Sequence, residues 1–292
     1  TDSVDLSVDD VETNKKLYGC NLKDKQIHAS KSLVYLYWCS FNNLVDSTTD
    51  GGGAIYIYTV SEKCPTGNCT IEHCTFEGCQ STKGGAITIK TAQIIRYFEI
   101  TSCKFINNKA TSTGGAIQFE ASFATVHNCE FKNNYAKTSG CEIYFLCGET
   151  RNPERDNPFL LSSNIFERNN NEQISSMIFL EWKTNSDFIF ENNEIKIDTT
   201  NEFHVFGFSG SYGSSGQILT FSSNCISPSK DNLISSSDTK VNNIINEGFS
   251  LCDTTEPTIT NEPTITDINC PSAPTDSVDL SVDDVETNKK LY

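Results

Sequence analysis

A short motif recurs seven times in this chain and constrains the fold more than any other feature. Each copy is a Cys or Asn followed two residues later by Phe or Ile, and the positions three and five residues before this anchor are apolar or small. The anchors are Cys39, Cys74, Cys103, Cys129, Asn164, Asn193 and Asn224. Alternation with a period of two is typical of a strand with one buried face, not of a helix. Each motif therefore predicts a short β-strand.

The spacing of the anchors is too long for the hairpins of a meander and too regular for a sandwich with mixed loops, so it indicates a coil. A second apolar strand lies between anchors and is opened by GGAI at 52–55, 84–87 and 114–117, and by the degenerate SSMI at 175–178. Glycines there suit a positive φ or a close approach of two coils. We predict an all-β fold, a right-handed parallel β-helix with two strands per coil. The seven anchors should form an internal structural ladder, in which small side chains hydrogen-bond to the copies above and below.

The two ends of the chain repeat each other. Residues 1–18 and 275–292 both read TDSVDLSVDDVETNKKLY, so that Thr275 repeats Thr1 and one period covers 1–274. We interpret the sequence as one period of a tandem array plus the start of the next copy. Two copies of an added tag are the alternative, although this stretch runs without a break into Gly19 and Cys20. The predicted domains are a junction strand (1–18), the parallel β-helix (19–252), a Thr/Pro-rich linker (253–274) and the start of the next copy (275–292).

The junction between periods has its own composition. Residues 253–274 contain the doublet EPTITN and EPTITD, which favours an extended chain and blocks a helix. In the duplicated stretch Val4, Leu6 and Val8 alternate with polar residues as one more strand. We expect this strand to dock on a neighbouring coil stack and so couple one period to the next. A solvated acidic linker is the alternative.

Two motifs in alternation suggest a family. GGAI occurs together with FxxN at 105–108, 131–134, 166–169 and 190–193. This pattern resembles the polymorphic outer membrane protein repeats of chlamydiae, and similar repeats occur in large surface proteins of some protists. The resemblance covers 39–208, with departures at FNNL (41–44) and FEGC (76–79). It implies an extracellular β-helix associated with adhesion or surface display. Phe190 also fits the apolar position three residues before the anchor Asn193, and with this assignment all seven copies of the anchor motif have an apolar residue there.

Thirteen cysteines in 292 residues favour an oxidising compartment and disulfides. Stacked anchors fall within disulfide range. The candidate pairs are Cys39 with Cys74, Cys103 with Cys129, Cys64 with Cys69, Cys141 with Cys147, and Cys252 with Cys270. For the anchors, buried thiols that act as small apolar fillers are the alternative. Because thirteen is odd, one thiol per period is left over or bonds to another copy.

Charge and motif content exclude several classes of function. The net charge of -16 without a basic run argues against nucleic acid as partner. No apolar stretch is long enough for membrane insertion in this segment. The scattered acids, four histidines and few arginines predict no catalytic, cofactor-binding or metal site.

These observations predict a non-enzymatic structural repeat unit of an extracellular filament or surface stalk, whose partners are other copies of itself. The alternatives are an adhesin that presents the loops at 61–68 and 148–158 from a rod, and a β-helix polysaccharide lyase or glycosidase. Glycans are further possible partners. The candidate acceptors are Asn68 in a sequon and, by composition, Thr258, Thr260, Thr264 and Thr266.

Overall fold

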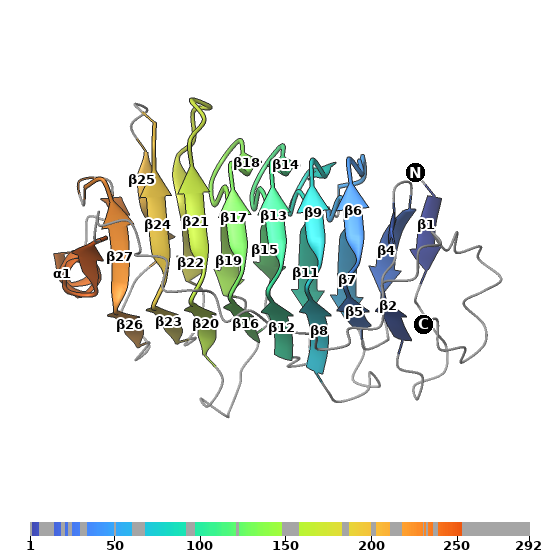
Figure 1. The fold of residues 1–292 in the computed structure, drawn as a ribbon, viewed down its shortest axis with the longest axis horizontal. Coiled ribbons are helices and arrows are strands. Elements are labelled where there is room, and N and C mark those ends of the chain that lie inside the picture. Colours follow the sequence, from blue (N-terminus) through green and yellow to red (C-terminus); the bar gives the residue numbers. More distant parts are fainter. Residues whose placement is uncertain are drawn as a thin grey trace, which may run out of the picture.

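The protein is a parallel β-solenoid built from three long sheets. The structure, a computed structural model, describes residues 2–5, 15–18, 21–22, 25–29, 34–49, 51–59, 68–91, 97–120, 123–147, 158–182, 187–199, 203–210, 218–229, 231, 233–235 and 239–252. Along the long axis the strands follow one another in chain order from the N-terminal end to helix α1 (Thr239–Glu247) (Figure 1). The predicted all-β, parallel solenoid fold is confirmed. The right-handed sense of the coil stays a prediction.

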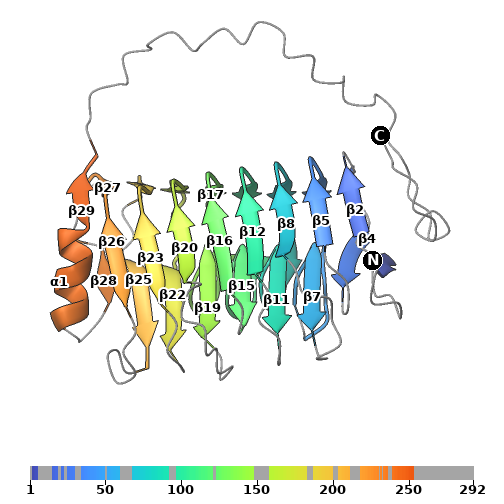
Figure 2. The same cartoon turned by 90° about the horizontal axis from the view of Figure 1, so that it is seen from below.

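Every described coil but the last passes through the three sheets in turn, and in the last coil helix α1 takes the place of the sheet B strand (Figure 2). Sheet A contains β1 (Asp2–Asp5), β4 (Lys25–Ala29), β7 (Ile55–Thr59), β11 (Ile87–Thr91), β15 (Ile117–Glu120), β19 (Ile143–Cys147), β22 (Ser176–Trp182), β25 (His204–Ser209) and β28 (Ile234–Ser235). Sheet B contains β2 (Lys15–Tyr18), β5 (Val34–Tyr37), β8 (Asn68–Glu72), β12 (Tyr97–Thr101), β16 (Phe123–His127), β20 (Phe159–Ser162), β23 (Phe188–Glu191) and β26 (Leu219–Ser222). Sheet C contains β3 (Asn21–Leu22), β6 (Ser40–Asn42), β9 (Thr75–Glu77), β13 (Lys104–Ile106), β17 (Glu130–Lys132), β21 (Ile165–Arg168), β24 (Glu194–Ile197), β27 (Asn224–Ser227) and β29 (Phe249–Leu251).

The prediction of two strands per coil was wrong. The anchor motif contains a sheet B strand and a sheet C strand, and the chain bends between them just before the anchor. Three middle coils add a short fourth strand, β10 (Gln80–Ser81), β14 (Lys109–Ala110) and β18 (Tyr135–Ala136). The bend was missed because its backbone has a positive φ of 52–55° at Trp38, His73, Ser102, Asn128, Ser163, Asn192 and Ser223. Trp38 and the three serines carry no sequence signal for that conformation, unlike Gly, Asn or His.

The core is a set of ladders along the solenoid axis. The residues three before each anchor are in register from coil to coil, as in the pairs of Ile100 with Ile71 and with Val126. Two residues after the anchor, Phe41, Phe76, Phe105, Phe131 and Phe166 form one continuous stack with ring centroids 4.8–5.0 Å apart. All five rings are fully buried. Since coils repeat at the strand spacing, identical side chains pack against one another at van der Waals distance.

Both roles expected for the GGAI glycines occur. The first glycine has a positive φ, of 81°, 51° and 67° at Gly52, Gly84 and Gly114. The second touches the next coil, so that a Cβ on Gly85 would lie 2.1 Å from the carbonyl oxygen of Gly115. A Cβ at Gly85 would therefore clash with that carbonyl oxygen. The two glycines thus allow the turn and the close approach of neighbouring coils.

A further copy of this turn escaped the sequence comparison. It reads GCEI at 140–143, and Ile143 pairs with Ile117 of the GGAI strand before it. Gly140 retains the positive φ of 66°. The second glycine is replaced by Cys141 and the alanine by Glu142, so this turn places a carboxyl group at a core position.

Candidate functional site

The first ladder, defined as the seven anchors, is a continuous chain of hydrogen bonds inside the solenoid. In each case the backbone N–H of one anchor donates to the side chain of the anchor in the next coil. For Cys39 to Cys74, Cys74 to Cys103 and Cys103 to Cys129 the N–S distance is 3.4 Å, and for Cys129 to Asn164, Asn164 to Asn193 and Asn193 to Asn224 the N–O distance is 2.9 Å. The structure thus brings all seven anchors together in one line.

The side chains of the first ladder also donate, and thiols and amides do so to the same groups. Asn164 Nδ2 donates to the carbonyl oxygen of Val126 at 2.9 Å, and Cys129 Sγ donates to that of Ile100 at 3.5 Å. Each acceptor is the residue three before the anchor of the preceding coil. A thiol is a weak donor and a weak acceptor, whereas an amide is a strong one of both kinds. Cys and Asn therefore make the same hydrogen bonds between coils, and those of Asn are the stronger.

Two predicted disulfide staples were wrong. Cys39, Cys74, Cys103 and Cys129 are buried thiols, which was the alternative weighed from the sequence. Cys69 and Cys141 are also buried thiols, so the pairs with Cys64 and Cys147 do not form, although Cys64 itself lies outside the described residues. In the ladder, the thiols of Cys74, Cys103 and Cys129 each accept a hydrogen bond from the backbone N–H of the preceding anchor.

Four of the buried thiols have a raised pKa. Burial raises the pKa of Cys79 and of Cys141 to about 12 and that of Cys103 well above its usual range. For Cys74 the hydrogen bond with the Cys103 thiol is the largest cause of a raised pKa. The thiolate is the form that reacts and binds metal. Cys74, Cys79, Cys103 and Cys141 are therefore held in their unreactive form.

A second ladder follows the stacked phenylalanines and consists of Leu44, Cys79, Asn108 and Asn134. The backbone N–H of Cys79 donates to Asn108 Oδ1, and that of Asn108 to Asn134 Oδ1, each at 2.9 Å. The FxxN motif thus has the same physical origin as the anchor. It does not extend to 166–169, because β21 continues straight through this position and leaves Asn169 exposed.

The second ladder meets a buried Glu142–Arg168 pair. Both side chains are fully buried, and Glu142 Oε1 lies 4.0 Å from Arg168 Nη1. Asn134 Nδ2 donates to Glu142 Oε2 at 2.5 Å, while Arg168 Nη1 donates to the carbonyl oxygen of Asn134 at 2.7 Å. Burial raises the pKa of Glu142 to about 7 against the opposing attraction of Arg168. A separation of 4.0 Å is too long for the ion pair to offset the loss of water.

The sequence alone did not single out either member of this pair. Glu142 stands where the equivalent coils have Ala54, Ala86 and Ala116, as the register of the isoleucines one residue later shows. Alignment of GCEI with GGAI would have revealed an acid at an apolar position. Arg168 carries no such signal, because its burial depends on the extension of β21.

The C-terminal end of the described solenoid is closed by a helix and a disulfide. Val241 and Ile245 of α1 are buried in the core, where Phe249 also packs against Phe221. Cys225 of β27 is bonded to Cys252, with the two Cα atoms 4.8 Å apart. The predicted pair of Cys252 with Cys270 was therefore wrong: β29 lies beside β27 and puts Cys252 next to Cys225.

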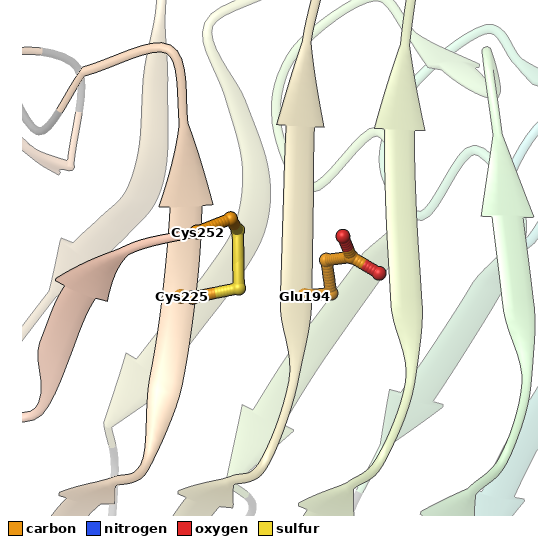
Figure 3. Close-up of side chains that lie close together, drawn as sticks. All are labelled: Glu194, Cys225 and Cys252. Atoms are coloured by element: carbon orange, nitrogen blue, oxygen red, sulfur yellow. A yellow bond between two sulfur atoms is a disulfide. The ribbon is translucent and has the colours of Figure 1, made fainter. Parts of the chain in front are cut away.

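Glu194 lies beside this disulfide, and the three side chains form the one metal-like group found among the described residues (Figure 3). Both sulfurs are already bonded to each other, so neither can act as a thiolate ligand. The Glu194 carboxylate is also 3.1 Å from Lys196 Nζ. In the oxidised protein this cluster is a covalent staple, not a metal centre.

Two glutamates on the outside of sheet C are paired with lysines of the preceding coil. Lys104 Nζ lies 3.2 Å from Glu130, and Lys132 Nζ lies 2.8 Å from Glu167. A surface hollow of about 340 Å³ is lined by Glu167, Asn169, Lys196, Ile197, Asp198 and Ser227. Its glutamate is engaged by Lys132.

The candidate glycosylation residues fall at the margin of what the structure describes. Asn68 is the first residue of β8, where it pairs in register with Tyr97. Thr258, Thr260, Thr264 and Thr266 lie outside the described residues, as do the linker and the second copy at 275–292. No helix in the described part of the chain is long and apolar enough to cross a membrane.

No protein-family model, curated protein or solved structure matches this chain. The resemblance to the chlamydial repeats therefore rests on its motifs, and membership of that family stays a prediction.

Proposed function

We propose that this chain is a non-enzymatic structural repeat unit of an extracellular filament or surface stalk, in which the unit 1–274 is repeated in tandem. The identity of 1–18 with 275–292 carries the proposal. A parallel solenoid suits this role, since coils that contact only their neighbours build length without a central pocket. The hydrogen-bonded ladders and the aromatic stack from Phe41 to Phe166 then stabilise the rod along its axis.

Charge and redox chemistry support an extracellular location. One full period carries a net charge of -13, because the five acids and two lysines of the second copy are subtracted from the total of -16. Like-charged units repel each other and stay extended and soluble. The Cys225–Cys252 disulfide is of the kind that persists in an oxidising compartment.

Electron microscopy of the native assembly tests the proposal. We expect a fibre whose axial repeat corresponds to one unit, 1–274. Discrete single units in native material, or a coding sequence with the unit only once, would contradict it.

Display of loops is a second candidate function, favoured by the anchor spacing. The two widest intervals, Cys39 to Cys74 and Cys129 to Asn164, each have a sequence separation of 35, and they contain the insertions at 61–68 and 148–158. The other four separations run from 26 to 31. An adhesin would use such loops to contact host glycans or proteins. Deletion of both loops should abolish binding to cells or glycan arrays if they are adhesive, and should change nothing in a purely structural unit.

A further inference from the structure

Sheet A buries a carboxamide on its outer face. Gln118 of β15 alternates with the core residues Ile117 and Phe119, so its side chain leaves the opposite face of the strand, yet it is only 1% exposed. Its register partners in the neighbouring strands, which Figure 2 shows side by side, are Thr88 of β11 and Tyr144 of β19. Among these three strands, β15 alone therefore places a carboxamide at this position.

The carboxylate of Glu120 brings this amide together with a lysine amine. Gln118 Nε2 donates to Glu120 Oε1 at 2.6 Å, and Lys83 Nζ donates to the same oxygen at 3.1 Å. Because both nitrogens contact one oxygen, they can be no farther apart than the sum of these two distances. The side chain of Glu120 is 9% exposed, so the carboxylate between them is largely shielded from water.

Thr113 contacts the other end of the amide. Its Oγ1 lies 2.5 Å from Gln118 Oε1. An ionised carboxylate can only accept hydrogen bonds, so the nitrogen of Gln118 faces Glu120 and the carbonyl oxygen faces Thr113, whose hydroxyl is then the donor. Such a donor stabilises the negative charge that forms on a carbonyl oxygen when a nucleophile adds to its carbon. The carbonyl of Gln118 is therefore polarised on the side away from its leaving nitrogen.

The turn before β11 holds Lys83 in place. The carbonyl oxygen of Lys83 accepts from Ser81 Oγ at 2.5 Å and from Thr88 Oγ1 at 2.9 Å. The next residue, Gly84, donates its N–H to the carbonyl oxygen of Thr113 at 3.0 Å, so the turns that carry Lys83 and Thr113 lie side by side. Rotation of the long lysine side chain is then enough to bring Nζ to the attack distance of about 3–3.5 Å from Gln118 Cδ.

We propose that Lys83 and Gln118 become joined by an autocatalytic isopeptide bond, with Glu120 as the proton shuttle and Thr113 as the donor to the reacting carbonyl. The bond links the turn before β11 to β15, and so ties two consecutive coils together covalently. It forms once in each chain without turnover, which agrees with a non-enzymatic structural unit. The inference stands on this cluster alone and does not depend on the tandem array.

The reaction exchanges one amide for another. Glu120 takes a proton from the Lys83 ammonium, and the neutral amine attacks Cδ of Gln118. Glu120 passes that proton to Nε2, the bond between Cδ and Nε2 breaks, and ammonia leaves. The attacking nitrogen loses its second proton through Glu120 to the departing ammonia, which becomes ammonium and restores the carboxylate. One C–N bond forms and one breaks, so the step needs no oxidant, reductant or other reactant.

Lys90 is a matched control for the nucleophile. Its Nζ lies 3.7 Å from Glu120 Oε2, the oxygen that does not contact the amide, and 5.8 Å from the ring centroid of Tyr58. Lys83 and Lys90 thus share one carboxylate, but only Lys83 shares an oxygen with Gln118. The geometry therefore assigns the attack to Lys83.

Mass spectrometry of the full chain, denatured and reduced, tests the bond. We expect the wild type to be lighter than its sequence mass by one ammonia. Lys83→Arg and Glu120→Ala should each have their full sequence mass, whereas Lys90→Arg should still lack one ammonia. In a tryptic digest of the wild type, cleavage after Lys83 should be absent, and the peptide that contains it should be joined to the peptide that contains Gln118.

Two outcomes overturn the bond, and a third overturns its mechanism. A wild type of full sequence mass, with Lys83 and Gln118 recovered in separate unmodified peptides, excludes the bond. Loss of ammonia that persists in Lys83→Arg assigns it to another reaction of the chain. Complete crosslinking in Glu120→Ala removes Glu120 as the shuttle. The digest of the wild type decides whether the bond exists even where a variant fails to fold.

Discussion

The backbone N–H of Cys129 donates to Asn164 Oδ1 at 2.9 Å, and this contact is where the first ladder changes from thiols to amides. Both residues are buried and occupy the same position of consecutive coils. The change passes without a break in the ladder, because both side chains accept from the preceding coil and donate to a main-chain carbonyl. One structural rule therefore covers two residue types.

Substitution at Cys129 tests this rule. The Cys129→Asn variant should fold, and its free energy of unfolding should lie within about 1 kcal/mol of the wild-type value, because the amide can replace both hydrogen bonds of the thiol. Cys129→Val should lower the free energy of unfolding by about 1–3 kcal/mol, because it leaves the buried N–H of Cys103 without its acceptor. Denaturant unfolding measures both values. Equal losses in the two variants would show that the site needs only a small apolar group.

Alkylation separates buried thiols from disulfides. At pH 8 the native protein should take up almost no iodoacetamide at Cys74, Cys79, Cys103 and Cys141, because their raised pKa values and burial keep them as inaccessible thiols. After unfolding without reductant all four should be alkylated, as measured by peptide mass spectrometry. Cysteines that resist alkylation until reductant is added would instead be disulfide-bonded.

The Cys225–Cys252 disulfide should stabilise the C-terminal end. The two cysteines are 27 residues apart in the sequence. For a loop of this length, the lost entropy of the unfolded chain stabilises the folded state by about 3–4 kcal/mol. Cys252→Ser should lower the Tm and speed hydrogen exchange in α1 more than in the central coils. The double variant Cys225→Ser and Cys252→Ser is the control, since reductant should no longer change its Tm.

Glu142 should make stability depend on pH in the acid to neutral range. Its folded pKa of about 7 lies above the ordinary value of 4.5, so the folded state prefers the protonated form. The associated stability is complete below pH 4.5 and is lost as the pH rises through 7. By linkage the loss is about 3 kcal/mol once the carboxyl is ionised.

Glu142→Gln isolates this effect, because a neutral amide still accepts from Asn134 and does not titrate. The difference in unfolding free energy between wild type and variant should fall between pH 4.5 and 8, while the other carboxyl groups cancel. A difference that is constant over this range would mean that Glu142 keeps an ordinary pKa.

The period-two alternation and the anchor spacing were enough to predict a parallel solenoid and the register of its core. Ile71, Ile100 and Val126 pair across coils as their positions relative to the anchors required. The register could be predicted because each coil has the same arrangement, in which a strand with one apolar face stacks on the equivalent strand of its neighbour. The glycines of GGAI were interpreted correctly for the same reason, since a positive φ and a close approach are local demands.

Only the tertiary structure decided how the polar interior is satisfied. Cys39 and Cys74 are within reach of each other by spacing, yet the direction of the thiol along the stack makes them hydrogen-bond partners and not a disulfide. The position of Cys252 beside Cys225 depends on the return of β29 to sheet C, and the burial of Arg168 depends on a strand that fails to bend. Sequence periodicity states which residues are equivalent, whereas side-chain direction and the path of the chain at an irregular coil are set by packing in three dimensions.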